Sequence, residues 1–232
     1  MDPKTSVEHL PGIGRQYALK LKKLEIKTLE DLIYHFPFRY DDFSQIQSTQ
    51  NLTPGEKISF LGTVWQIKNI RTRNGKYLTT ATVADESGTI DVLWFNQPYL
   101  TKNIKPGTPI SLSGKVELDG KKYKMTSPQY EIVKNQQADL SIGKTIHTGR
   151  LVPIYPETDG VSSKWLRVKI ASLIANYTKT QNDFLPEEIK KRQKLENLNS
   201  ALQLIHFPEN YQQVEQARRR LSFDELFIIQ FL

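Results

Sequence analysis

The aromatic residues near position 95 are the part of this sequence whose chemistry points most directly to a ligand. Alternation along the predicted strand that ends at Phe95 places Val92 and Trp94 on the core face and the Phe95 ring on the opposite face. Tyr99 follows four residues later, in the loop after the strand. Two such rings can stack on unpaired nucleic-acid bases, with about 1–3 kcal/mol of binding energy per base. The alternative is that both rings form a small satellite core under the loop.

Basic residues gather around two predicted hairpins, whose turns are indicated by Asn74-Gly75 and Asp119-Gly120. Lysine and arginine side chains at hairpin tips bind phosphates without reading the base sequence, and such binding weakens as salt rises. Taken singly, each side chain is more simply a solvated surface charge, but their grouping on two hairpins favours a nucleic-acid contact. The candidate DNA-binding residues are Lys68, Arg71, Arg73 and Lys76 at the first hairpin and Lys121, Lys122 and Lys124 at the last.

The turn Leu10-Pro11-Gly12-Ile13-Gly14 precedes a basic helical segment. Glycines allow backbone N–H groups to approach a phosphate closely, and the start of the following helix adds a favourable dipole. Gly12 and Gly14 are therefore candidate DNA-binding residues of a helix-hairpin-helix-like element. A glycine turn between packed helices, with a solvated basic face, explains the same residues equally well.

No residue pattern in the chain indicates catalysis. Gly143-Lys144-Thr145 is similar to the end of a phosphate-binding P-loop, but Ala138 stands where that motif needs its first glycine. The four histidines lie far apart, and the spacing shows no set of nucleophile, histidine and carboxylate. We therefore expect no catalytic residue, no metal site and no bound cofactor in this chain.

The composition is that of a globular protein, since 38% of the 232 residues are hydrophobic and 25% are charged. The absence of cysteine excludes disulfide scaffolds and thiolate metal sites. No apolar stretch reaches the roughly 20 residues needed to cross a bilayer, and the N-terminus lacks a secretory signal, so we expect a cytoplasmic protein without a membrane contact. The net charge of +7 favours a polyanionic partner, although many basic proteins have none.

The periodicity of the apolar residues divides the chain into four segments and predicts the α+β class. Helical spacing in the first segment begins a helix after Thr28, whose side chain suits an N-cap. The final helical pattern ends among apolar residues without a cap, so we expect the chain to be the front part of a longer protein. The segments are a helical, helix-hairpin-helix-like region at 1–50, short strands at 51–135, an extended linker at 136–161 and helices at 162–232.

The strand segment has the order of an OB-fold, a small five-stranded barrel that often binds nucleic acids. Three strands, an interruption and two further strands predict this order, although an SH3-like barrel or part of a sandwich has a similar strand count. Gly62 lies inside the first strand, where we expect a bulge or a sharp bend. The predicted strands are 57–70, 77–85, 89–95, 109–118 and 122–133.

Motifs along nearly the whole chain resemble, in order, the N-terminal region of the bacterial RecG family of ATP-dependent DNA helicases. The family commonly has a histidine where this chain has Ser127, so a polar role of that histidine does not carry over. The motifs are Leu10-Pro11-Gly12-Ile13-Gly14, residues 28–42, Trp94-Phe95-Asn96 with Tyr99, Ser127-Pro128-Gln129-Tyr130, residues 151–156 with Gly160, His206-Phe207-Pro208 and residues 217–226.

The resemblance implies that the barrel is a wedge domain, which splits a replication fork as DNA is drawn through. In the family two wedge aromatics stack on bases at the junction, and Phe95 and Tyr99 match those positions. The helicase motor follows the wedge region and uses ATP and Mg²⁺, so the enzyme's catalytic site would lie outside this chain.

The function implied by the resemblance is the remodelling of stalled forks and Holliday junctions in recombination and repair. The expected partners are branched DNA and the motor domains in cis, on which residues 162–232 would pack, and a monomer is expected. The residues alone leave two alternatives open. One is a stand-alone OB-fold module for single-stranded DNA, and the other is a motor-docking domain with little DNA contact.

Overall fold

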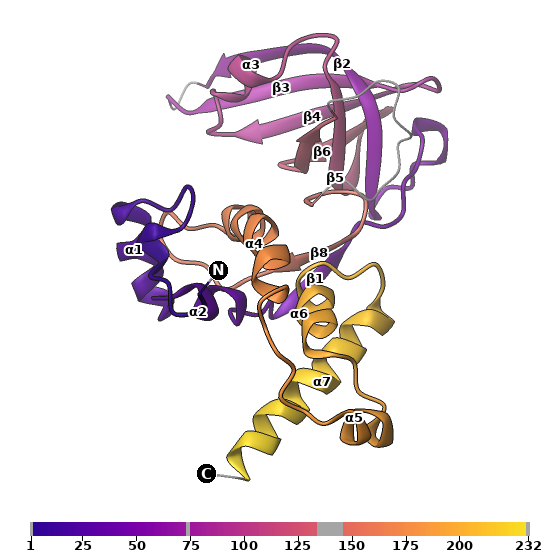
Figure 1. The fold of residues 1–232 in the computed structure, drawn as a ribbon. Helices are drawn as coiled ribbons and strands as arrows, with labels where there is room; N and C mark the ends of the chain where they lie inside the picture. Colours follow the sequence, from indigo (N-terminus) through magenta and orange to yellow (C-terminus); the bar gives the residue numbers. More distant parts are fainter. Residues whose placement is uncertain (1, 73–74, 134–145, 231–232) are drawn as a thin grey trace. The chain divides into compact units, whose positions relative to one another are not determined.

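The computed structural model describes residues 2–72, 75–133 and 146–230. The chain forms two compact units, which we call the barrel unit (Asp42–Val152) and the helical unit (Met1–Asp41 with Pro153–Leu232) (Figure 1). It passes between them at strands β1 (Arg39–Asp42) and β8 (Leu151–Ile154), which pair as a two-stranded sheet. None of the helices in the described ranges has the length and apolarity to cross a membrane.

The barrel unit has a six-stranded sheet in the order β2-β3-β4-β6-β5-β7, and β2 also pairs with β5. Pairing therefore runs around β2, β3, β4, β6 and β5 and back to β2, with a short helix, α3 (Leu100–Asn103), at the interruption. This order confirms the predicted α+β class and the OB-fold arrangement. The strands are β2 (Lys57–Arg71), β3 (Tyr77–Ala84), β4 (Thr89–Phe95), β5 (Pro109–Asp119), β6 (Lys122–Thr126) and β7 (Gln129–Ile132), and the 3₁₀ turn η3 (Thr49–Asn51) precedes them.

Two details of the strands differ from the sequence prediction. The predicted strand 122–133 is two strands, because Ser127 has a left-handed φ of 49° and Pro128 has no N–H to donate, so the chain leaves β6 there and β7 pairs with β5. The irregularity of β2 lies between Val64 and Gln66, so of the bulge or sharp bend predicted at Gly62, the bulge was wrong. Gly62 is instead a close-approach position, since a Cβ there would lie 2.5 Å from the carbonyl oxygen of Ala84.

The interior of the barrel is built from the inward-facing residues of strands β2 to β6 and from apolar residues in and next to α3. Trp94 is almost fully buried, and its indole N–H donates to the carbonyl of Pro128 at 3.2 Å, so the one polar group of the ring is satisfied. The core also contains Ile58, Phe60, Val64, Ala81, Val83, Ile90, Val92, Leu100, Ile104, Ile110, Leu112, Val116 and Met125.

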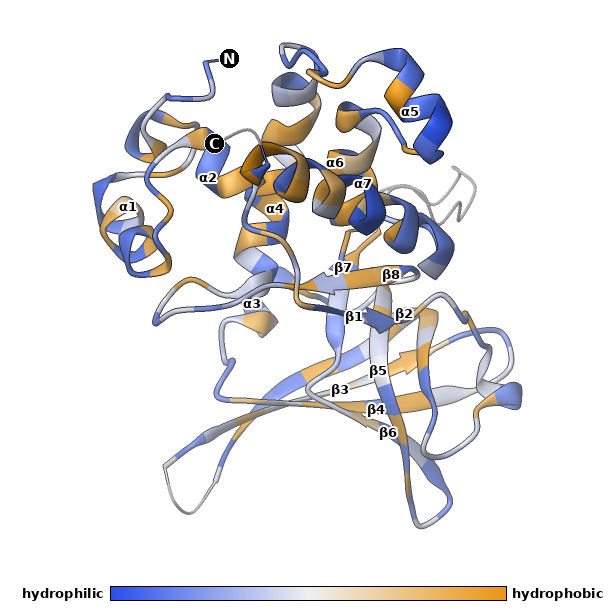
Figure 2. Cartoon of the chain, turned by 90° about the horizontal axis from the view of Figure 1, so that it is seen from below, coloured by the Kyte–Doolittle hydropathy of each residue, from blue (hydrophilic) through white to orange (hydrophobic). Residues whose placement is uncertain are grey.

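The helical unit joins the two ends of the chain in one hydrophobic core. Leu21, Leu29 and Ile33 from the N-terminal segment belong to the same buried cluster as Ile170 and Leu202 from the C-terminal segment. The apolar residues of α4 and α6 are visible in Figure 2. The elements are η1 (Val7–His9), α1 (Arg15–Leu21), η2 (Lys22–Leu24), α2 (Leu29–Ile33), α4 (Ser163–Thr178), α5 (Glu187–Gln193), α6 (Leu198–His206) and α7 (Tyr211–Ile229).

The predicted start of the helix after Thr28 is confirmed in atomic detail. The Thr28 hydroxyl oxygen accepts from the N–H of Asp31 at 3.1 Å, and the Asp31 carboxylate accepts from the N–H of Thr28 at 2.9 Å. This reciprocal pair is a capping box, which satisfies two backbone donors that the short helix α2 would otherwise leave free.

His206 is a buried, neutral side chain that ties α6 to the N-terminal segment. Its Nε2 lies 2.7 Å from the carbonyl oxygen of Ile33, and its Nδ1 lies 2.8 Å from the hydroxyl of Tyr155. Because a carbonyl can only accept, Nε2 carries the proton and Nδ1 accepts from Tyr155. Burial lowers the pKa of His206 to about 4.

We expect the free energy of unfolding to fall by about 3 kcal/mol, through His206, as the pH drops from about 6.5 to 4. The folded pKa lies below the ordinary value of 6.5, so the unfolded chain binds the proton first and acid favours unfolding. Urea titrations at several pH values measure this, with His206→Asn as the control that lacks the titrating group. Parallel pH profiles of the two proteins would contradict the prediction.

Candidate nucleic-acid interface

The outer face of β3 and β4 carries Phe95 within a row of cross-strand neighbours. Ile70 pairs with Leu78, and Leu78 pairs with Phe95. The next row contains Lys68, which pairs with Thr80. Since residues two apart on a strand point to the same face, Phe95 shares its face with Lys68. The Phe95 ring is 56% exposed and Tyr99 is 51% exposed, so neither ring is buried in a satellite core.

The loop that carries Tyr99 is held by hydrogen bonds to β2 and β3. The side-chain N–H₂ of Asn69 donates to the carbonyl of Pro98 at 2.9 Å, and Asn69 Oδ1 accepts from the hydroxyl of Thr79 at 2.7 Å. The N–H of Asn96 donates to the carbonyl of Tyr77 at 2.8 Å. These bonds fix the loop to the part of the β2–β3 hairpin next to its turn, so the two exposed rings are positioned before any ligand arrives.

The β2–β3 hairpin extends from the barrel beside this loop (Figure 2). Lys68, Arg71 and Lys76 are exposed on it, and Arg73 lies outside the described residues. An OB-fold binds nucleic acids on its central strands between its first and last hairpins, and here these hairpins are β2–β3 and β5–β6. The candidate residues of the barrel therefore belong to elements that flank one face.

The lysines of the β5–β6 hairpin stand apart from Phe95. Lys124 pairs in register with Asp91, four residues before Phe95, which corresponds to about 13 Å along the strand. Its ammonium already has carboxylate partners, Asp119 at 3.3 Å and Glu117 at 3.8 Å. Lys121 and Lys122 at the turn are exposed. The hairpin thus presents two accessible ammonium groups, and the third is paired with carboxylates of the same hairpin.

Gly12 and Gly14 lie in the helical unit, at the turn before α1. Gly12 has a left-handed φ of 69°, which glycine adopts without strain, and Gly14 is the N-cap of α1. Both glycines are exposed. Gly143 and Lys144 of the P-loop-like motif lie outside the described residues. Across the described ranges, no three histidine, aspartate or glutamate residues are close enough to hold a metal ion.

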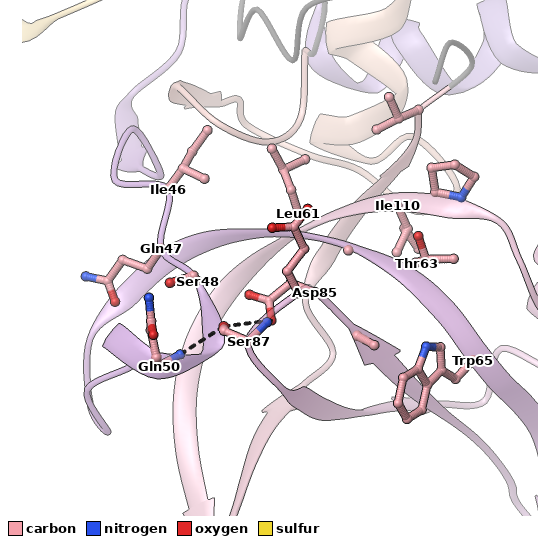
Figure 3. A pocket seen from close by; sticks show the side chains of 15 residues that line it. Ile46, Gln47, Ser48, Gln50, Leu61, Thr63, Trp65, Asp85, Ser87 and Ile110 are labelled. Atoms are coloured by element: carbon pink, nitrogen blue, oxygen red, sulfur yellow. Dashed lines mark hydrogen bonds between the residues drawn. The ribbon is translucent and has the colours of Figure 1, made fainter. Parts of the chain in front are cut away.

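Trp65, which no sequence pattern indicated as a site residue, is 65% exposed on β2. Trp65, Ile46 and Leu61 line a groove of about 1100 Å³ on the barrel unit (Figure 3). Alternation could not locate this ring, because the strand irregularity between Val64 and Gln66 changes which face each residue occupies.

The charge of this groove does not suit a phosphate backbone. None of its lining residues is lysine or arginine, and Asp85 and Glu86 form part of its rim. Partial burial acts to raise the pKa of Asp85, but hydrogen bonds from Thr49 and Ser87 outweigh it and lower the pKa to about 2. Asp85 is therefore ionised at neutral pH, and the face of Phe95 and Lys68 is the better candidate for DNA.

Comparisons with known proteins identify the family of the chain. A family model described as the RecG wedge domain matches residues 6–177. The ATP-dependent DNA helicase RecG of Thermotoga maritima is 32% identical over 232 residues, which cover 99% of this chain and 29% of that protein. The same helicase of Bacillus subtilis is 29% identical, with 98% of this chain and 32% of that protein covered.

Among solved structures, the structure of RecG bound to a three-way DNA junction matches with a TM-score of 0.80 and 30% identity. The match covers 99% of this chain and 31% of that chain. The chain therefore spans less than a third of the length of these relatives.

Proposed function

This chain belongs to the RecG wedge domain family, and we propose that it is the branched-DNA-binding region of a RecG-like ATP-dependent helicase. The observation that supports this most directly is the pair of exposed rings, Phe95 and Tyr99, beside a basic hairpin. Stalled forks and Holliday junctions are the proposed substrates, because a junction offers unpaired bases next to duplex arms. The intact protein would remodel them in recombination and repair.

The proposed action of the barrel is mechanical and requires no bond chemistry. Phe95 and Tyr99 would stack on the last bases at the junction, where the two strands separate. Lys68, Arg71 and Lys76, together with Lys121 and Lys122, would bind backbone phosphates without reading sequence. Rigid placement of the rings is sufficient, since a duplex pulled against them cannot continue as a stacked helix.

The motor domains, in cis, would supply the movement. ATP and Mg²⁺ would be bound there, and the chain's own residues would only hold and direct DNA. Helices in the range 162–232 would pack on the motor and transmit its position to the barrel. The proposed protein is a monomer.

Binding of this chain to a three-way junction, a duplex and a single strand of equal total length tests the proposal. We expect at least about 30-fold tighter binding to the junction than to the duplex at the same salt concentration, because only the junction offers unpaired bases for the two rings as well as duplex phosphates. Tighter binding to the plain single strand would support a stand-alone single-strand-binding module. Weak binding that does not change with salt would support a motor-docking domain.

A further inference from the structure

Two aromatic rings and two lysines form a layered surface between α1 and α4 of the helical unit. The rings of Tyr17 and Trp165 stack with centroids 4.7 Å apart and planes 10° from parallel. The Lys20 ammonium lies 5.7 Å from the centroid of the Tyr17 ring, and the Lys169 ammonium lies 5.7 Å from that of Trp165. Because each ring already faces its partner ring on one side, the ammonium groups occupy the outer sides of the stack.

The ammonium group of each lysine also lies close to a glycine in the turn before the other helix. A Cβ at Gly12 would clash with the Lys169 Nζ, and a Cβ at Gly160 would clash with the Lys20 Nζ. Both glycines have left-handed φ angles, 69° and 73°. The lack of a side chain at Gly12 and Gly160 therefore leaves room for the two ammonium groups.

The charges around this surface are predominantly positive. Neither Lys20 nor Lys169 forms an ion pair with a carboxylate of the described residues. Arg15, Lys22 and Lys23 are exposed on the same segment, α1 and η2. The acidic residues of the Gly160 turn are Glu157, which accepts from the N–H of Ser163 at 2.6 Å, and the exposed Asp159.

We infer that the surface of Lys20, Tyr17, Trp165 and Lys169 binds the phosphate backbone of duplex nucleic acid, independently of sequence. Bases cannot stack on rings whose faces are already covered, so the surface offers charge and no stacking platform. Two ammonium groups that have no carboxylate partner in the described part of the chain are instead suited to phosphates. The inference rests on the proposed DNA-binding function and adds a second DNA-binding surface, for duplex phosphates, in the helical unit. It also gives Gly12 a role other than backbone contact with a phosphate.

The salt dependence of binding to an unbranched duplex tests this surface. Each phosphate contact contributes about 0.9 to the slope of log K against log salt. We expect the double variant Lys20→Gln, Lys169→Gln to lower the slope by about 1.8. A matched control, Lys179→Gln with Lys191→Gln, removes two exposed lysines of the same unit and is expected to leave the slope unchanged. Lys20→Arg with Lys169→Arg keeps both charges and is expected to retain the slope.

An unaltered slope in the glutamine variant, or an equal loss in the control, would overturn the inference. Phe95 and Tyr99 remain in every one of these lysine variants, and the duplex has no junction. The result therefore does not depend on whether the two rings recognise forks. If the Phe95 and Tyr99 variant loses its junction preference while the Lys20 and Lys169 variant keeps the slope of the parent chain, the proposed function stands and this inference fails.

Chemical acetylation of the parent chain gives a second measurement, which requires no substitution and therefore cannot be affected by misfolding of a variant. We expect a duplex to protect Lys20 and Lys169 from an acetylating reagent, and Lys179 to react at the same rate with and without DNA. Vesicles of phosphatidylserine serve as the competing polyanion. Protection of the two lysines by vesicles, without protection by duplex, would overturn the inference in favour of a lipid surface.

Discussion

Replacing Phe95 and Tyr99 together by alanine is expected to reduce the preference for a three-way junction over a duplex by about 30-fold or more. Stacking contributes about 1–3 kcal/mol per base, and two rings acting on two bases give at least about 2 kcal/mol. Both rings are more than half exposed, so their removal leaves the barrel core intact. Binding of each variant to junction and duplex DNA, at one salt concentration, measures the ratio.

Two control variants separate stacking from a general effect on the barrel. Trp65→Ala removes another exposed ring of the same unit, in the groove without basic residues, and is expected to keep the preference. Tyr99→Phe keeps the ring and removes only the hydroxyl that donates to Gln97 at 2.9 Å, so it is also expected to behave like the parent chain. If the double alanine variant binds junctions with undiminished preference, these two rings have no part in recognition.

Replacing Asp183 by alanine is expected to lower the free energy of unfolding by about 3–5 kcal/mol. Asp183 accepts from both terminal nitrogens of Arg220, at 2.8 Å and 2.6 Å, and the Arg220 side chain is fully buried. Loss of the carboxylate would leave a buried guanidinium that, among the described residues, has only Asp224 as a carboxylate partner. Although partial burial acts to raise it, hydrogen bonds from Arg220 hold the pKa of Asp183 well below its usual range.

Equilibrium unfolding in urea measures this loss, and Glu187→Gln is the matched control. Glu187 is a mostly exposed partner of Lys190, at 2.6 Å, and exposed ion pairs contribute about 0–1 kcal/mol. We therefore expect a small change for Glu187 and a large one for Asp183. Similar losses in the two variants would show that burial does not strengthen the Asp183–Arg220 pair.

Local chemistry explains the predictions that the structure confirms. The Thr28 cap needs only an oxygen and a backbone N–H three residues apart, so neighbouring residues are enough to predict it. The outward position of Phe95 follows from strand alternation, because its neighbour Trp94 is a core residue. The order of the strands followed from turn signals such as Asp119-Gly120, which lie between apolar runs.

The wrong predictions concern places where distant segments decide the local conformation. Gly62 suggested a bulge, but its lack of a side chain serves the close approach of Ala84, twenty-two residues away in sequence. Neighbouring residues also do not show which of the arginines at 218–220 is buried: Arg220 lies against Asp183, and Arg218 is exposed. Such partners are chosen by packing and cannot be read from the residues beside them.

The sequence by itself determined the periodic elements, the succession of the strands along the chain and the type of residue at the loop after β4, because these depend on spacing within one segment. Only the tertiary structure decided that both ends of the chain share one core, that Trp65 is exposed, and that Lys20 and Lys169 face glycines of the opposite turn. The physical reason is the separation in sequence over which each interaction acts. Alternation and capping act over a few residues, whereas burial and the seating of a charged group depend on which distant segments pack together.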